Sequence, residues 1–209
     1  MARAERGKMD RIVIRNAERA DVHRLLEIYA YYVRMTAITF DVEVPDADRF
    51  AAHMEQIQKR YPYLVLERNG RIEGYAYAGP FVGRAAYDWS CELTIYLDPE
   101  VRRKGLGRKL YGELEKRLAR MGILNLYACI GYPETEDEYL TRNSAEFHAH
   151  LGFALCGRFN RCGYKFDRWY DMVWMEKQIG EHRSPMPQII PYRETEQEIG
   201  VALLRSDSL

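Results

Sequence analysis

The sequence predicts one domain of the α/β (α+β) class, built around a mixed, mostly antiparallel sheet with helices flanking it. The chain has 209 residues, of which 47% are hydrophobic and 30% charged, so it can bury one core. Strand-like and helix-like segments alternate over residues 11–180. Both short turns and helices join consecutive strand-like segments, and this combination of hairpins and crossovers gives a mixed sheet.

The first half of the chain predicts a strand, two helices and a hairpin. Asp46 and Asp48 place carboxylates at the positive end of the second helix. Asn69-Gly70 is typical of a tight turn between two paired strands. Alternation and helical spacing then give the elements in order: a strand at 11–15, helices at 20–34 and 46–60, and strands at 62–68 and 71–78.

The second half predicts two crossovers and two final strands. The segment 123–130 is almost wholly apolar, which indicates a strand in the interior of the sheet. Gly152 follows the last helix, where glycine favours a helix end. The predicted elements are a strand at 89–97, a helix at 105–121, a strand at 123–130, a helix at 141–151, and strands at 153–160 and 170–177.

The two ends of the chain differ from the domain between them. Residues 1–10 form a short extension before the first strand. Residues 181–209 hold three prolines and many charges without sustained periodicity. We expect this tail to be irregular or to pack on a partner chain.

Composition argues against several classes of protein. Lys plus Arg and Asp plus Glu both total 31. The chain therefore lacks the basic excess that is typical of a protein with a nucleic-acid partner. No apolar run approaches the roughly 18 residues of a membrane-spanning helix, so we expect no membrane association. The N-terminus lacks a secretory pattern, and the four cysteines show neither C-x-x-C nor zinc-finger spacing. We therefore expect a cytoplasmic protein with reduced thiols and without a metal.

The sharpest local feature is a basic, glycine-containing turn before the third predicted helix. It reads Arg102-Arg103-Lys104-Gly105-Leu106-Gly107 and follows Asp98-Pro99, which closes a strand. A helix start presents unpaired N–H groups and partial positive charge, and glycine lets a phosphate approach the backbone. The turn therefore indicates a phosphate-binding site. It matches neither the Walker nor the Rossmann pattern.

In its context this turn resembles a known family. The run ELTIYLDPEVRRKGLG is similar to the acetyl-CoA motif of the GNAT N-acetyltransferase superfamily. The segments GRAAYDWSCELTIYL, SAEFHAHLGF and GYKFDRWYDMVWME resemble its phosphinothricin acetyltransferase branch. The resemblance covers residues 12–180. It implies a GNAT-like domain, with the strand at 92–97 splayed from that at 123–130, and acetyl-CoA as cosubstrate.

The resemblance also implies how acetyl-CoA is held. Main-chain groups of Ile95 and Leu97 would bond the pantetheine arm along the splayed edge. Arg102, Arg103, Lys104, Gly105, Leu106 and Gly107 would cradle the pyrophosphate. The branch has an asparagine where this chain has Thr141, and we expect Asn143 to replace it.

Two residues match the branch's catalytic positions. Glu92 corresponds to a proposed general base, and desolvation on an apolar strand would raise its pKa toward that task. His148 corresponds to a position that protonates the departing thiolate or orients the substrate. Tyr111 matches a tyrosine of the family with a structural or functional role.

The acceptor side is implied less sharply. Phe40 matches an aromatic residue that lines it, and Arg84 and Tyr87 match residues that recognise an acidic group. The implied function is acetyl transfer to a small amino-acid-like substrate such as phosphinothricin, methionine sulfoximine or methionine sulfone, by a homodimer.

Two alternatives remain open at this point. One is a GNAT acting on a peptide N-terminus, polyamine or aminoglycoside. The acidic insert 132–139 could attract such cations. The other is an acetyl-CoA-binding module without catalysis.

Overall fold

The structure is a computed structural model that describes residues 10–101 and 105–196. The order of its strands and helices is the order predicted from the sequence. The strands are β1 (Ile12–Asn16), β2 (Tyr63–Arg68), β3 (Arg71–Pro80), β4 (Ser90–Leu97), β5 (Asn125–Tyr132), β6 (Ala154–Lys165) and β7 (Arg168–Gln178). The helices are α1 (Val22–Met35), α2 (Ala47–Gln58), α3 (Leu106–Met121) and α4 (Asn143–His150).

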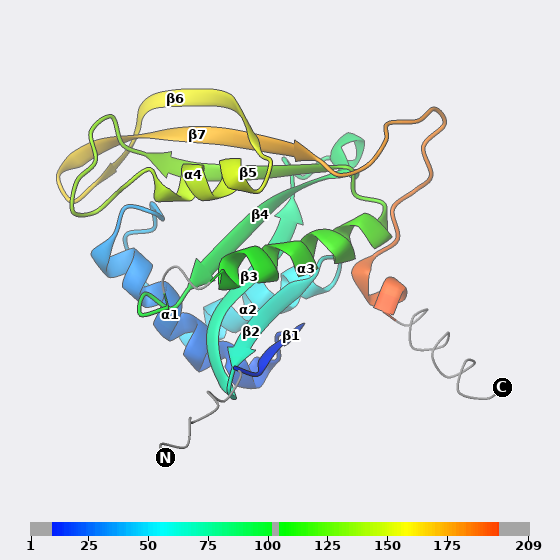
Figure 1. Ribbon diagram of the computed structural model, residues 1–209, viewed down its shortest axis with the longest axis horizontal. Coiled ribbons are helices and arrows are strands. Elements are labelled where there is room, and N and C mark those ends of the chain that lie inside the picture. The colour runs from blue at the N-terminus through cyan, green and yellow to red at the C-terminus, as the bar shows by residue number, and fades with distance from the viewer. Residues whose placement is uncertain (1–9, 102–104, 197–209) are drawn as a thin grey trace, which may run out of the picture.

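The seven strands form one sheet in the order β1-β2-β3-β4-β5-β7-β6 (Figure 1). The β4–β5 pair is parallel and the other five are antiparallel. This confirms the predicted mixed sheet. It also confirms the interior place of β5, whose apolar sequence indicated burial on both faces.

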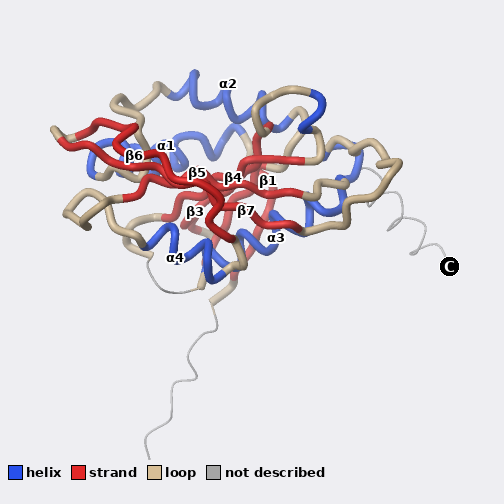
Figure 2. The backbone as a smooth tube through the Cα atoms, turned by 90° about the horizontal axis from the view of Figure 1, so that it is seen from above, coloured by secondary structure: helices blue, strands red, loops and turns tan. Residues whose placement is uncertain are grey.

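Helices cover the sheet from both sides (Figure 2). One core lies between the sheet and α3 and includes Leu110, Leu114 and Leu118. The other lies under α1 and α2 and includes Leu25 and Ile28. None of the helices in the described ranges has the length and apolar content needed to span a membrane.

The sheet opens between its two central strands. β4 and β5 pair only from Ser90 to Glu92, which lies opposite Tyr127. Beyond that point β4 stays bonded to β3 as far as Leu97, and β5 stays bonded to β7 as far as Tyr132. The facing edges of β4 and β5 therefore carry unpaired main-chain groups along the opening, and the predicted splay is confirmed.

The last hairpin is longer than the sequence indicated. The predicted strand at 153–160 instead continues to Lys165, and β7 begins at Arg168. A bulge with Arg161 at a φ of 48° lets the strand continue past its irregular stretch. The turn between β6 and β7 places Phe166 and Asp167 at positive φ. Asn-Gly is the pair that usually indicates such a turn, so Phe166-Asp167 did not indicate one.

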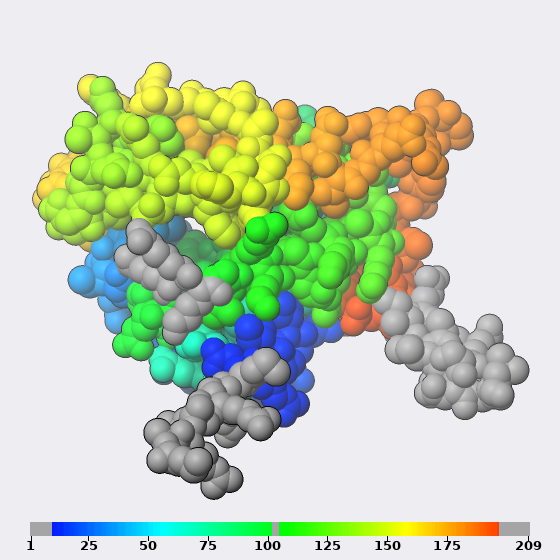
Figure 3. All heavy atoms as spheres, viewed as in Figure 1, coloured from blue at the N-terminus to red at the C-terminus, as the bar shows by residue number. Residues whose placement is uncertain are grey.

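The described part of the tail packs on its own domain. Tyr192 is 5% exposed and belongs to the core beside α3. The Trp89 indole donates to the Pro187 carbonyl at 2.8 Å, and the Ile190 N–H donates to the Met121 carbonyl at 2.9 Å. In Figure 3 this segment runs down beside the end of α3, in orange to red. It therefore adds to the core of its own chain.

Candidate active site

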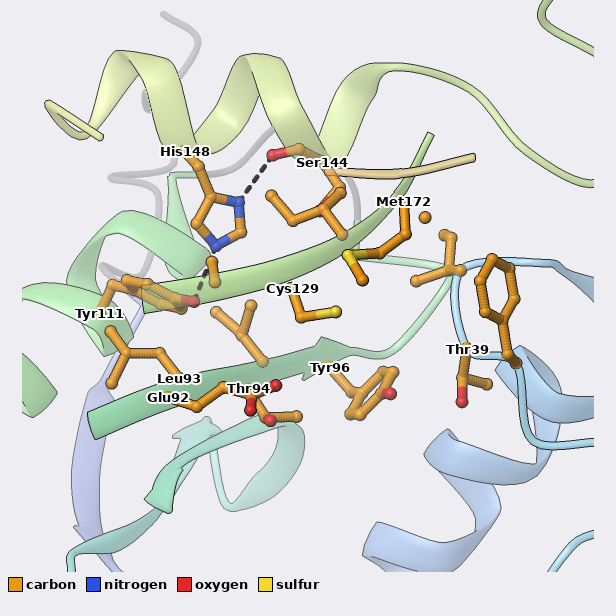
Figure 4. A pocket seen from close by; sticks show the side chains of 16 residues that line it. Thr39, Glu92, Leu93, Thr94, Tyr96, Tyr111, Cys129, Ser144, His148 and Met172 are labelled. Atoms are coloured by element: carbon orange, nitrogen blue, oxygen red, sulfur yellow. Dashed lines mark hydrogen bonds between the residues drawn. The ribbon is translucent and has the colours of Figure 1, made fainter. Parts of the chain in front are cut away.

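A cavity of about 270 Å³ lies in the opening between β4 and β5 (Figure 4). Its walls come from β4, β5, α3, α4 and the segment after α1. It brings together five residues singled out from the sequence: Phe40, Glu92, Ile95, Tyr111 and His148. Tyr111 and Ser144 complete its polar lining beside His148.

The two faces of β4 carry different chemistry because side chains alternate along a strand. Thr94 and Tyr96 lie opposite Tyr77 and Tyr75, which pack under α1 and α2. Glu92 has the same parity and shares that face. The intervening apolar residues, Leu93, Ile95 and Leu97, pack toward α3.

Glu92 is half-buried, and its carboxylate has no hydrogen bond or ion pair with any residue in the described ranges. Burial raises its pKa above the usual range for glutamate. The local reason is its place where the β4–β5 pairing ends, between apolar neighbours on one strand. An unpaired carboxylate with a raised pKa suits a proton acceptor.

His148 and Tyr111 form a buried pair across the cavity from Glu92. The His148 Nδ1 lies 2.7 Å from the main-chain carbonyl of Ser144, which only accepts, so Nδ1 carries the proton. Burial lowers the pKa of His148, so the ring is neutral near pH 7. Its Nε2 therefore accepts from the Tyr111 hydroxyl at 2.8 Å. The ring has no free N–H, and the mobile proton of this pair lies on Tyr111.

Tyr111 reaches this position from the buried face of α3, and His148 from α4. Both are almost fully buried, at 0% and 3% exposure. Phe153 packs edge-on against the imidazole, with a ring separation of 5.2 Å. Their contact joins residues 37 positions apart, which the spacing within either helix does not reveal.

The described part of the predicted phosphate-binding turn is its last three residues, at the start of α3. Gly105 has a φ of 69°, and α3 begins at Leu106. A Cβ on Gly107 would lie 3.2 Å from the Phe147 ring and 3.3 Å from Leu97, so only glycine fits without displacement. The three basic residues Arg102, Arg103 and Lys104 lie outside the described residues.

Leu97 and Asn143 are the two other residues predicted to contact the acetyl-CoA arm. The Leu97 carbonyl accepts from the Tyr32 hydroxyl at 2.6 Å, so this group already has a partner. Asn143 is the first residue of α4, and its neighbour Ser144 lines the cavity.

Arg84 and Tyr87 do not join the central cavity as the structure describes it. Arg84 precedes a short 3₁₀ turn (Ala85–Tyr87) before β4, and Tyr87 is the last residue of that turn. Tyr87 packs edge-on against Phe81, with ring centroids 5.6 Å apart. Phe81 and Glu92 line a neighbouring hollow, so Tyr87 packs against one of the residues that line it.

Phe40 is locked by two glycines at the cavity's edge. A Cβ on Gly163 would lie 2.3 Å from its ring, and one on Gly131 would lie 3.6 Å from it. Lys165 donates to the Thr39 carbonyl at 2.8 Å and ties the same segment to β6. The connection after α1 is therefore held against the last hairpin.

The acidic insert is bonded mainly to arginines and a tyrosine of the last hairpin. Asp137 accepts the Tyr170 hydroxyl at 2.9 Å, and Arg168 pairs with it at 2.9 Å. Arg168 also pairs with Glu138 at 2.8 Å. The Glu136 carboxylate accepts the N–H of Arg142. The insert thus attaches its loop to the last hairpin, and Arg161 and Arg168 offset part of its negative charge. Within the described ranges, no cluster of His, Cys, Asp and Glu is arranged to hold a metal ion.

Comparison with known proteins identifies the family. The model of the acetyltransferase (GNAT) domain matches residues 14–174. The phosphinothricin N-acetyltransferase of Streptomyces viridochromogenes is 32% identical, over 84% of this chain and 92% of that protein. The L-methionine sulfoximine/L-methionine sulfone acetyltransferase of Salmonella typhimurium is 34% identical, over 83% of this chain and 98% of that protein.

Solved structures agree with these relatives. A phosphinothricin acetyltransferase of Sinorhizobium meliloti, in complex with acetyl-CoA, superimposes with a TM-score of 0.77 at 32% identity, covering 87% of this chain and 98% of that chain. An acetyltransferase of Salmonella typhimurium with its cofactor acetyl-CoA gives 0.75 at 33%, covering 84% and 98%. The fold, the site geometry and these relatives show that the chain is an acetyltransferase of the GNAT family.

Proposed function

We propose that the protein transfers the acetyl group of acetyl-CoA to the α-amine of a small amino-acid-like acceptor of the phosphinothricin, methionine sulfoximine or methionine sulfone type. One observation carries the proposal. The unpaired Glu92 carboxylate and the Tyr111–His148 pair line one cavity, on opposite sides of the β4–β5 opening. That arrangement separates a proton acceptor from a group that can stabilise a leaving sulfur.

The residues present fit acetyl-CoA. The unpaired edges of β4 and β5 offer main-chain partners to the amides of a pantetheine arm, and Ile95 lines the cavity at that edge. The first turn of α3 presents main-chain N–H groups to a phosphate, and the space beside Gly105 is open, with nothing within 4 Å of where its Cβ would lie.

Glu92 acts as the general base in this proposal. The acceptor nitrogen attacks the thioester carbonyl, its proton passes to the Glu92 carboxylate directly or through a water, and the carbon–sulfur bond breaks. An α-amine is less basic than a lysine side chain, so a fraction of it is neutral near pH 7 and a modest base suffices.

The Tyr111–His148 pair serves the leaving group. The sulfur departs as a thiolate, and a thiol has a pKa of about 8.5, so a hydrogen bond is enough to support it. As charge develops on sulfur, the Tyr111 O–H turns from His148 Nε2 toward it. We therefore assign the donor role to Tyr111 and give His148 the role of positioning it.

Three observations support an amino-acid acceptor over the alternatives. Relatives of similar length are named for phosphinothricin and for methionine sulfoximine or sulfone. The acidic insert already forms ion pairs with Arg168 and Arg161, which lowers its attraction for polyamines or aminoglycosides. An unpaired, half-buried Glu92 has no structural partner that would account for it in a binding module.

We also propose a cytoplasmic homodimer. Large side chains on the last hairpin stay exposed in one copy of the chain, including Phe159 at 53% and Trp169 at 61%. Covering such side chains is a common reason for association. Light scattering of the purified protein tests it: a mass near 49 kDa, about twice that of the 24.6 kDa chain, supports the dimer, and a single-chain mass contradicts it.

A thiol-release assay with acetyl-CoA and a panel of amines tests the activity. Turnover with phosphinothricin, methionine sulfoximine or methionine sulfone is expected, with little turnover of polyamines. Release with polyamines alone would contradict the acceptor class. Tight acetyl-CoA binding without release for any amine would contradict catalysis.

A further inference from the structure

A second cavity, of about 410 Å³, lies on the Glu92 face of the sheet beneath α2 and the connection between α1 and α2. Its floor consists of tyrosines from three adjacent strands and one from α1: Tyr29, Tyr63, Tyr75, Tyr77 and Tyr96. A volume of this size suits a small ligand or part of one.

Two of these tyrosines are buried without hydrogen-bond partners for their hydroxyls. Tyr63 and Tyr75 are each 1% exposed and line the cavity. Neither hydroxyl bonds a residue in the described ranges, and neither oxygen is sealed from the cavity. Their rings stack in parallel, with centroids 5.7 Å apart. A buried hydroxyl without a partner costs free energy, so it calls for a water or ligand oxygen.

These hydroxyls act as donors rather than as charged groups. Burial and the neighbouring phenols raise the pKa of Tyr63 and of Tyr75 well above the usual range. Both therefore stay protonated throughout the physiological range, and each can donate to an oxygen on a ligand.

The tyrosine cavity adjoins the catalytic cavity. Tyr96 lines both. Tyr77 lies opposite Thr94, two residues along β4 from Glu92, and its pKa is raised by burial with a contribution from the Glu92 charge. Two strand residues span about 7 Å, which is the reach of a long amino-acid side chain. An acceptor with its amine at Glu92 can thus extend its side chain here.

The rim of the cavity sets the charge that it favours. Asp41 and Glu43 face Arg49 there, and Asp41 accepts the Tyr29 hydroxyl. His53 also lines the cavity, and burial lowers its pKa, so it adds no charge near pH 7. Lys165, packed nearby, donates to the Thr39 carbonyl. The rim itself carries two negative groups against one positive, which disfavours an anionic side chain.

From these observations we infer that the tyrosine cavity holds the acceptor's side chain and selects an uncharged, oxygen-bearing one, such as a sulfone or sulfoximine, over an anionic phosphinate or carboxylate. The inference rests on the proposed function and names the preferred members of its substrate class. The hydroxyls of Tyr63 and Tyr75 donate to the side-chain oxygens, and the tyrosine rings contact its carbon chain.

The test compares methionine sulfone with methionine, which lacks the two oxygens. The wild-type protein is expected to have a higher kcat/KM for the sulfone. Tyr63→Phe and Tyr75→Phe should each lower the sulfone-to-methionine ratio by about fivefold, the worth of one hydrogen bond. Tyr61→Phe removes a hydroxyl from a buried tyrosine of the other core and should leave the ratio unchanged. An unchanged ratio in both cavity variants would overturn the inference.

Two further arms separate this inference from the proposed function. Methionine sulfone should be acetylated with a higher kcat/KM than phosphinothricin, and the reverse order would overturn the selection by charge. Calorimetric binding of methionine sulfone to the CoA-loaded protein needs no turnover. If no amino acid is acetylated while the sulfone binds, and binds more weakly to Tyr63→Phe, the proposed function fails and the cavity assignment stands. If the sulfone does not bind, the cavity assignment fails.

Discussion

The two faces of β4 show how one strand divides a reaction between two sides of a sheet. On the face under α1 and α2, Glu92 stands without a partner at the head of a row of polar side chains. On the face toward α3 and α4, Tyr111 and His148 are buried and bonded to each other. Alternation along β4 places Glu92 on the first face, and the packing of α3 and α4 places Tyr111 and His148 on the other.

The comparison teaches that partners, more than burial, set the roles of these groups. Both sites are desolvated, and burial raises the pKa of Glu92 while it lowers that of His148. Glu92 has no hydrogen-bond or ion-pair partner among residues 10–101 and 105–196, so its carboxylate is available to accept a proton. The bonds of His148 fix its tautomer and move the available proton to Tyr111.

The sharpest way to break this division is to remove the carboxylate. Glu92→Gln keeps the shape of the side chain and removes the base, so kcat should fall by about 10²- to 10⁴-fold. Acetyl-CoA binding, measured by calorimetry, should change little. Glu146→Gln, on the exposed side of α4, is the matched control. Activity of Glu92→Gln within a few-fold of wild type would contradict the base assignment.

The opposite face is tested by Tyr111→Phe. Losing a buried donor aimed at developing charge should lower kcat by about 10²-fold, as for other such donors. The acetyl-CoA affinity should hold. Tyr61→Phe again serves as the control for removing a buried phenol. If Tyr111→Phe is nearly silent while His148→Ala is severe, the donor is His148, as the sequence resemblance implied.

A smaller effect on activity is expected when Phe40, on the acceptor side of the cavity, is displaced. Gly163→Ala places a methyl group 2.3 Å from the Phe40 ring, so the ring must move from the cavity's edge. The KM for the acceptor should rise by roughly tenfold, about 1.4 kcal/mol, and stability should fall by about 1–3 kcal/mol. Gly157→Ala, on the same strand with open space around it, is the control. Equal effects of both variants would show that Phe40 does not shape the acceptor site.

A difference in stability should separate the faces as well. The folded pKa of Glu92 is raised, so its ionised form destabilises the fold, and this penalty grows as the pH rises past the unfolded value of about 4.3. Glu92→Gln should therefore raise the melting temperature at pH 7, and the gain should shrink toward pH 4. A variant that melts lower at pH 7 would mean that the carboxylate has a stabilising partner.

The smallest expected effect concerns the acidic insert. Glu134→Gln with Glu138→Gln removes carboxylates that pair with Arg161 and Arg168 at the surface. Exposed pairs contribute about 0–1 kcal/mol, so kcat/KM for amino-acid acceptors should stay within about twofold. A large fall in turnover of a cationic acceptor would restore the insert as a binding surface.

The sequence predicted the fold's order closely because its signals were local. Alternation marked the strands, and Asn69-Gly70 forms the tight turn, with both residues at positive φ. The predicted end of β6 was wrong. The bulge at Arg161 and the turn at Phe166-Asp167 are formed by residues that rarely adopt positive φ. Such turns are imposed by strand pairing and leave little trace in composition.

The candidate site also contains both residues that the sequence predicted and contacts that it did not. Glu92, Ile95, Phe40 and His148 were placed by motif and converge on one cavity. The Tyr111–His148 bond joins two helices, and the tyrosine cavity joins three strands with α1. Contacts between elements far apart in sequence depend on packing, which no spacing encodes. Arg84 and Tyr87 matched the branch yet lie away from the central cavity.

The pH dependence of kcat/KM, measured with methionine sulfone for the wild type, Tyr111→Phe and Glu92→Gln, tests the division of roles most directly. Loss of the Glu92 proton should produce a rise in rate with pH, centred above the usual range for glutamate. This ionisation should persist in Tyr111→Phe and be absent from Glu92→Gln, which retains only the ionisation of the substrate amine. The same acid-side profile in Glu92→Gln as in the wild type would contradict Glu92 as the base.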